Sequence, residues 1–147
     1  MELVHSGSLN DEYYELTESQ LYEKAVMMFR VGDYSMAVHL FKLLILKFGV
    51  NAEYVKCLAG SLHANGELMV AGFWYNYAYS IDTLSHGECL YYSALVSFEG
   101  RDFVTAQNNF NKFLQQCKHV SYEKMIKKSK LYLEVIEFKL KQESGCE

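Results

Sequence analysis

Apolar and small residues recur in the same order in three stretches of the chain, at 21–44, 55–78 and 90–113. Each stretch holds two apolar runs, and a short segment beginning with glycine separates them. Apolar positions three and four residues apart lie on one face of a helix, so each stretch predicts two helices joined by a tight turn. We expect first helices at 18–31, 52–65 and 87–99, and second helices at 35–47, 68–81 and 103–116.

A separate apolar stripe follows the third stretch. It predicts a last helix at about 122–141, with Ser121 as its N-cap, that covers the open end of the preceding helices. The stripe consists of Met125, Ile126, Tyr132, Leu133, Ile136 and Leu140.

The three stretches align position by position, with steps of 34 and then 35 residues. The matched positions are Ala25, Ala59 and Ala94; Ala37, Ala71 and Ala106; and Phe41, Tyr75 and Phe110. A period of about 34 residues is that of tetratricopeptide (TPR) units. Small residues suit the crossing of two helices, because larger ones would force the backbones apart. The sequence therefore predicts an all-α solenoid of three TPR-type helical hairpins with a C-terminal capping helix.

Three segments follow from this reading. Residues 1–17 form an N-terminal extension, residues 18–141 the repeat domain with its capping helix, and residues 142–147 a disordered tail. In the turns, Gly32, Gly66 and Gly100 are expected to end the first helices. The extension carries apolar residues that we expect to pack on a second subunit or on the chain's own repeats. These candidate dimerisation residues are Leu9, Tyr13, Tyr14 and Leu16.

Composition excludes several kinds of partner. The net charge of −4 disfavours nucleic acid, and no apolar run is long enough to span a membrane. The four cysteines are far apart, which fits reduced thiols in the cytoplasm, and no signal peptide is apparent. Residues 1–20 hold five acidic residues and no Lys or Arg, whereas residues 118–141 hold seven lysines and three glutamates. These ends are either solvated faces or binding patches.

The sequence offers no catalytic or metal-binding pattern. The five histidines lack metal-ligand spacing, and there is no phosphate-binding glycine loop. We therefore expect no enzymatic activity, cofactor or metal. The remaining alternatives are a protein that binds another polypeptide, a general TPR scaffold, and an enzyme whose site the sequence does not reveal.

The first helices of a TPR stack line its concave face, where an extended apolar peptide would bind. The outward positions on these helices give the candidate groove. It comprises Tyr22, Val26 and Phe29 with Arg30 beside them, then Lys56, Gly60 and His63, and finally Tyr91, Leu95 and Phe98. Lys, Asn and Arg at these positions would suit an acidic tail, but Tyr22 and Val26 do not. The surplus of aromatic residues fits either this surface or the helical core.

The first unit resembles the class II chaperones of bacterial type III secretion systems. The similarity rests on Leu21, Tyr22, Ala25, Phe29, Gly32, Tyr34, Ala37, Phe41 and Leu44, and continues through Ala59, Gly60, Gly66, Ala71 and Ala78. Residues 6–9 are similar to an element that precedes the repeats in that family.

The resemblance implies a cytoplasmic bacterial chaperone. It would hold an extended segment of a hydrophobic translocator in the concave groove, and would form a homodimer through its N-terminal region. A client of another kind, such as an effector or another secreted subunit, stays open.

Overall fold

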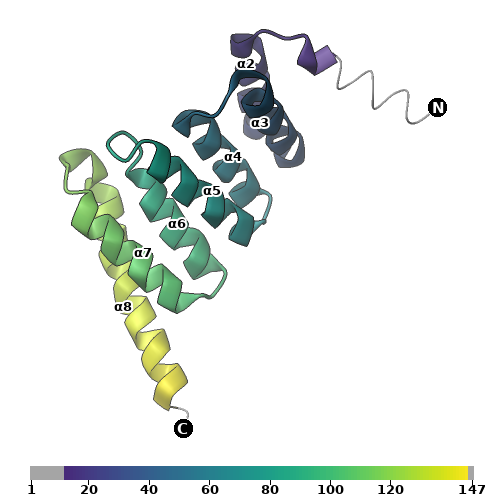
Figure 1. The fold of residues 1–147 in the computed structure, drawn as a ribbon. Helices are drawn as coiled ribbons and strands as arrows, with labels where there is room; N and C mark the ends of the chain where they lie inside the picture. The colour runs from purple at the N-terminus through teal and green to yellow at the C-terminus, as the bar shows by residue number, and fades with distance from the viewer. Residues whose placement is uncertain (1–11, 146–147) are drawn as a thin grey trace.

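The computed structural model describes residues 12–145, and helices pair along the chain into a curved stack (Figure 1). A helical turn at 12–14 precedes them. The three hairpins are α2 (Glu18–Arg30) with α3 (Tyr34–Phe48), α4 (Ala52–Ala64) with α5 (Leu68–Ile81), and α6 (Glu88–Glu99) with α7 (Phe103–Gln116). A 3₁₀ turn (η1, Val120–Tyr122) leads into the long α8 (Glu123–Gly145). The predicted all-α stack of three hairpins and a capping helix is confirmed.

Local side-chain caps explain where most helices begin. Thr17 and Gln20 form a reciprocal capping box at the start of α2. Asp33, Asn51 and Asp102 each accept a hydrogen bond from a backbone N–H in the first turn of α3, α4 and α7. These short-range signals lie in the sequence itself, so the predicted boundaries agree closely with the observed ones.

The turns within the hairpins need a residue with positive φ. Gly32 and Gly66 have φ of 86° and 83°, as the first two turns predict. In the third turn Gly100 directly follows the end of α6, as expected, but the left-handed conformation expected of it is wrong, because its φ is −80° and Arg101 takes that conformation at 65°. Arg101 occupies the position that the steps of 34 and 35 residues match to Gly32 and Gly66, so the left-handed conformation keeps the repeat register and the glycine lies one residue before it.

Two expectations about the C-terminal region are wrong. Residues 142–145 continue α8 instead of forming a disordered tail, since Gln142, Glu143 and Ser144 contain no helix-breaking residue before Gly145. Residues 146 and 147 lie outside the described residues. Ser121 is not the N-cap of α8, because it lies within η1 and donates its backbone N–H to the His119 ring, 3.1 Å away.

The alanine positions of the repeat lie at the helix crossings. Their side chains are completely buried at Ala25, Ala37, Ala59, Ala71, Ala94 and Ala106. The matched aromatics Phe41, Tyr75 and Phe110 are also buried. Two apolar clusters result, one centred on α2–α5 and one on α6–α8, and the predicted register is confirmed.

Replacing Ala71 with leucine is expected to lower the free energy of unfolding by roughly 1–3 kcal/mol. Ala71 is fully buried in the first cluster, and the added carbons would push α4 and α5 apart. Urea denaturation measures the loss. Ser35→Leu is the control, because Ser35 is exposed on α3 and should keep the wild-type midpoint. Equal midpoints for Ala71→Leu and wild type would show that this position does not lie at a tight crossing.

Candidate functional site

Two adjoining hollows lie across the first helices of the hairpins. The first, of about 250 Å³, is bordered by Tyr22, Val26, Phe29, Phe41, Cys57 and Gly60. The second, of about 470 Å³, is bordered by Phe29, Lys56, Gly60, His63, Ala64, Tyr75, Glu88 and Tyr92. Phe29 and Gly60 border both hollows, so we treat the two as one continuous groove.

The first hollow is apolar. The Tyr22 ring lies edge-on to Phe41 and tilted against Tyr54, with centroids 6.2 and 5.8 Å apart. Burial raises the pKa of the Cys57 thiol to about 11, so this group is neutral at physiological pH. With no charged side chain on its border, this hollow suits an apolar side chain.

The second hollow combines rings with polar groups. The His63 ring lies between the Tyr75 hydroxyl, at 3.2 Å, and a carboxylate oxygen of Glu99, at 2.7 Å. Tyr92 stacks on Tyr75 with 5.4 Å between the ring centroids. The hollow therefore offers flat apolar surface together with hydrogen-bonding groups, which suits a peptide backbone beside an apolar side chain.

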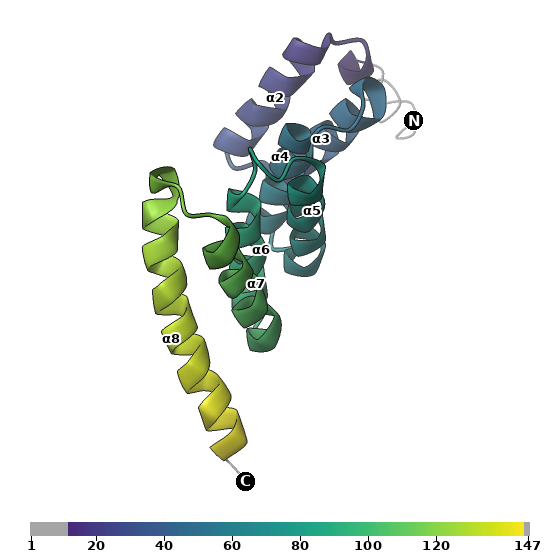
Figure 2. The same cartoon turned by 60° about the vertical axis from the view of Figure 1, so that its left-hand side comes forward.

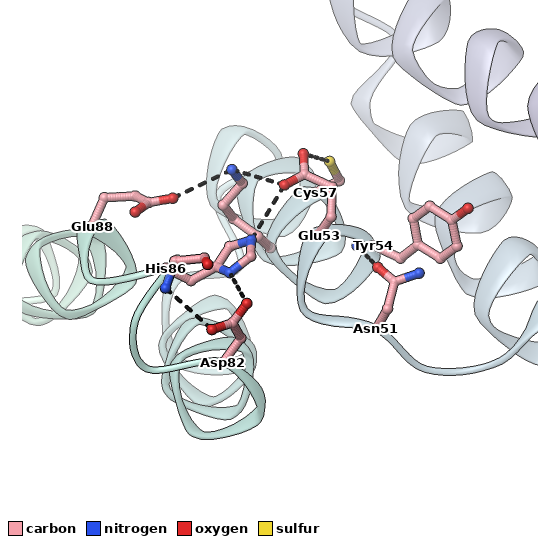
Figure 3. Close-up of polar contacts among 9 residues, drawn as sticks. Asn51, Glu53, Tyr54, Cys57, Asp82, His86 and Glu88 are labelled. Atoms are coloured by element: carbon pink, nitrogen blue, oxygen red, sulfur yellow. Dashed lines mark hydrogen bonds and ion pairs between the residues drawn. The ribbon is translucent and has the colours of Figure 1, made fainter.

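A polar cluster ties the second hairpin to the third at the edge of the groove (Figure 3). Lys56 Nζ lies 3.1 Å from a Glu53 oxygen and 3.4 Å from a Glu88 oxygen. The His86 ring reaches Glu53 at 3.4 Å and Asp82 at 3.6 Å. These contacts link α4, the loop after α5, and the start of α6.

Charge pairing sets the ionisation of this cluster. Burial alone would lower the pKa of Lys56, but Glu53 and Glu88 raise it on balance. Burial would likewise raise the pKa of Glu53, but Lys56 and His86 lower it on balance. Both groups are therefore charged at neutral pH, and the cluster acts as a structural tie.

The structure brings together six of the nine residues predicted for the groove. Tyr22, Val26, Phe29, Lys56, Gly60 and His63 all border the two hollows. Phe29 is 38 % exposed and lies on their shared border. Arg30, named beside them, is exposed but borders neither hollow.

The three residues predicted from the third hairpin lie elsewhere. Tyr91 was expected to be partly exposed, but it is only 5 % exposed and packs against Phe110 and Phe113. Phe98 lies 4.8 Å from the Tyr132 ring of α8, and Leu95 packs against the same apolar cluster. Tyr91 is covered by α7 of its own hairpin, whereas Phe98 is partly covered by α8, which packs on α7 and reaches α6, a long-range contact that repeat spacing does not reveal.

Tyr92 is the main groove residue that the sequence reasoning missed. It is one residue after Tyr91 and one helical turn after Glu88, which also borders the second hollow. Tyr92 matches Cys57 of the second hairpin in the repeat register, and Cys57 also borders the groove, so this position faces the groove in both units. The i, i+4 spacing of Glu88 and Tyr92 could have indicated this face. Phe41, Cys57, Ala64 and Tyr75 were also missed as lining residues.

The candidate dimerisation residues are only partly described. Leu9 lies outside the described residues, while Tyr13 and Leu16 pack against the chain's own first cluster. Lys47 Nζ donates to the backbone carbonyls of Tyr14 and Leu16, the latter at 2.8 Å, and lies 4.9 Å from the centre of the Tyr14 ring. Residues 13–16 are therefore fixed against α3 of the same chain.

Between residues 12 and 145, no three His, Cys, Asp or Glu side chains gather closely enough to hold a metal ion. Over the same residues, no helix has both the length and the apolar character needed to cross a membrane.

No protein-family model matches the chain, and no curated protein matches its sequence. Several solved structures share its fold. The Yersinia enterocolitica type III secretion translocator chaperone SycD has a TM-score of 0.76 at 18 % identity, covering 86 % of this chain and 90 % of SycD. SycD bound to a peptide of the translocator YopD has a TM-score of 0.74 at 18 % sequence identity, and the match covers 82 % of this chain and 92 % of SycD. Pseudomonas aeruginosa PcrH with the chaperone-binding region of PopD has a TM-score of 0.74 at 19 % sequence identity, and the match covers 85 % of this chain and 96 % of PcrH. At these identities the likeness establishes the fold.

Proposed function

We propose that this chain is a type III secretion chaperone that binds an extended segment of a hydrophobic translocator in the groove. The observation that carries the proposal is the groove itself, an open, largely apolar channel across α2, α4 and α6 with the half-exposed ring of Phe29 on its border. Large apolar surface left open in a free protein is typical of a binding site.

The two hollows favour an extended segment over a folded partner. They lie side by side and share Phe29 and Gly60, so neighbouring side chains of one strand can enter them in turn. Gly60 has no side chain, which lets a peptide backbone approach α4 closely. Burial of apolar area would stabilise the complex at about 25 cal/mol per Å², before the cost of ordering the peptide.

Solved structures of the same fold support the choice of client. SycD was crystallised with a peptide of the translocator YopD, and PcrH with the chaperone-binding region of PopD. The groove of this chain would cover an apolar segment of such a client, which would otherwise aggregate, and keep it unassembled in the bacterial cytoplasm before export. The chain would do this by binding alone, without catalysis.

The proposal includes a homodimer. The dimer contacts would come from the N-terminal extension before residue 12, including Leu9, because Tyr13 and Leu16 already pack within the chain. One of the SycD structures is described as an alternative dimer, which supports self-association in proteins of this fold.

Affinity capture from lysate of the source organism, followed by mass spectrometry, tests the function. We expect one dominant secreted protein with apolar segments to be captured, and expect it to become soluble when co-expressed with this chain. A captured effector or other secreted subunit would keep the chaperone role and change the client. Capture of several unrelated proteins, with no gain in the solubility of any, would indicate a general scaffold.

A further inference from the structure

The outer face of α8 is unlike that of an ordinary capping helix. Leu131, Val135 and Phe138 are 61 %, 43 % and 60 % exposed. Their spacing of four and three residues places them on one side of the helix, while Ile136 on the opposite side is fully buried. Leu131 and Val135 border a hollow of about 260 Å³ that Phe98, Lys128 and Tyr132 also line. A helix that only covers a stack needs one apolar face, but α8 has two.

Three lysines lie before the N-terminal end of this second apolar stripe, and the exposed Glu134 lies within its span. Lys124, Lys127 and Lys128 precede Leu131 by seven, four and three residues, and so lie on the same side of the helix. Lys127 pairs with Glu123 at 3.1 Å, an exposed contact of little energy. In the part of the chain that the structure describes, neither Lys124 nor Lys128 takes part in an ion pair. The occupant of this face should therefore be apolar and acidic.

The N-terminal segment of the chain has this chemistry. Residues 1–11 contain no Lys or Arg and carry Glu2 and Asp11. Leu3, Val4 and Leu9 supply apolar side chains in the same stretch. Residues 1–11 lie outside the described residues.

The arrangement of the fold favours a contact between two copies. Lys47 holds residues 14–16 against α3, so the segment starts at the end of the stack opposite to α8 (Figures 1 and 2). Eleven residues span at most about 38 Å when fully extended. To reach α8 of its own chain, the segment would have to run extended along the stack. The α8 of a second copy can instead lie next to the segment.

We propose that residues 1–11 of one copy bind the outer face of α8 in a second copy. Leu3, Val4 and Leu9 cover the stripe of Leu131, Val135 and Phe138, and the acidic groups lie beside the lysines. Two such contacts related by a twofold axis close a dimer. The inference rests on the homodimer proposed above and is independent of client binding.

Charge exchange between full-length chains tests this arrangement. One variant carries Lys124→Glu, Lys127→Glu and Lys128→Glu on α8. The other carries Glu2→Lys and Asp11→Lys in the segment. Alone, each variant places like charges at both contacts, so its dimer dissociation constant should rise at least tenfold in analytical ultracentrifugation. Mixed, they pair opposite charges at both contacts and should form a dimer with each other. Circular dichroism checks that both variants keep their helices.

Three results would overturn the proposal: a monomeric wild type, wild-type dimerisation by each variant alone, or no dimer in the mixture. Phe73→Ser is the matched control, because Phe73 is a 63 % exposed apolar residue on α5, away from the lysines. This variant should dimerise like wild type. If its dimer dissociated while the dimers of the two charge variants stayed intact, the interface would lie on α5. Client capture is measured separately, so none of these results bears on the groove.

Discussion

Replacing Tyr91 with alanine is expected to lower the free energy of unfolding by about 3–5 kcal/mol. The ring is 5 % exposed, and its centroid lies 5.9 Å from that of Phe110 and 5.7 Å from that of Phe113. Truncating a buried aromatic removes these contacts and leaves a cavity that the surrounding helices fill only in part. Burial also raises the pKa of the Tyr91 hydroxyl to about 12, in keeping with its enclosed position.

Urea denaturation followed by circular dichroism measures this loss. Phe73→Ala is the control, because its ring is mostly exposed on α5 and should cost about 1 kcal/mol or less. A loss below 1 kcal/mol for Tyr91→Ala would contradict the packing of α6 against α7. It would favour instead the sequence-based expectation that Tyr91 faces the groove.

Replacing Gly60 with leucine is expected to weaken client binding at least a hundredfold, or about 2.7 kcal/mol. Gly60 borders both hollows, and a Cβ there would lie 3.7 Å from the Tyr75 hydroxyl, an ordinary contact. The backbone of α4 therefore tolerates a side chain, and loss of glycine from a helix interior is itself stabilising by roughly 0.5–1 kcal/mol. The leucine would fill the space that the peptide needs.

Calorimetric titration with the binding segment of the captured client measures the effect. Asn111→Leu adds a side chain of the same kind at an exposed position on α7, and should bind like wild type. Phe29→Ala removes an aromatic anchor without filling the groove, and should cost about 1–3 kcal/mol of binding. Full affinity in Gly60→Leu, with unchanged helical content, would move the binding site away from this groove.

The sequence predicted the features of this fold that depend on neighbouring residues. Caps such as Asp33, Asn51 and Asp102 act within one helical turn, and the buried alanines follow the repeat period. The left-handed residue of the third turn was misplaced because Gly100 lies next to Arg101, and glycine is the usual residue in that conformation.

The groove was predictable only where the repeats themselves form it. Tyr22, Phe29 and Gly60 follow from helical periodicity in the first two hairpins. In the third hairpin, Phe98 packs on Tyr132 of α8, and Tyr92 stacks on Tyr75 of the second hairpin and borders the groove. Both effects arise from the packing of distant segments, which the spacing of residues within one helix does not contain.

An NMR titration of the isotope-labelled chain with the client segment tests the central claim most directly. The account predicts that the largest backbone amide shifts fall on groove residues of α2 and α4, around Phe29, Cys57 and Gly60, with small shifts on the outer faces of α5 and α7. Shifts concentrated on α5, α7 or α8, with none at Gly60, would contradict it.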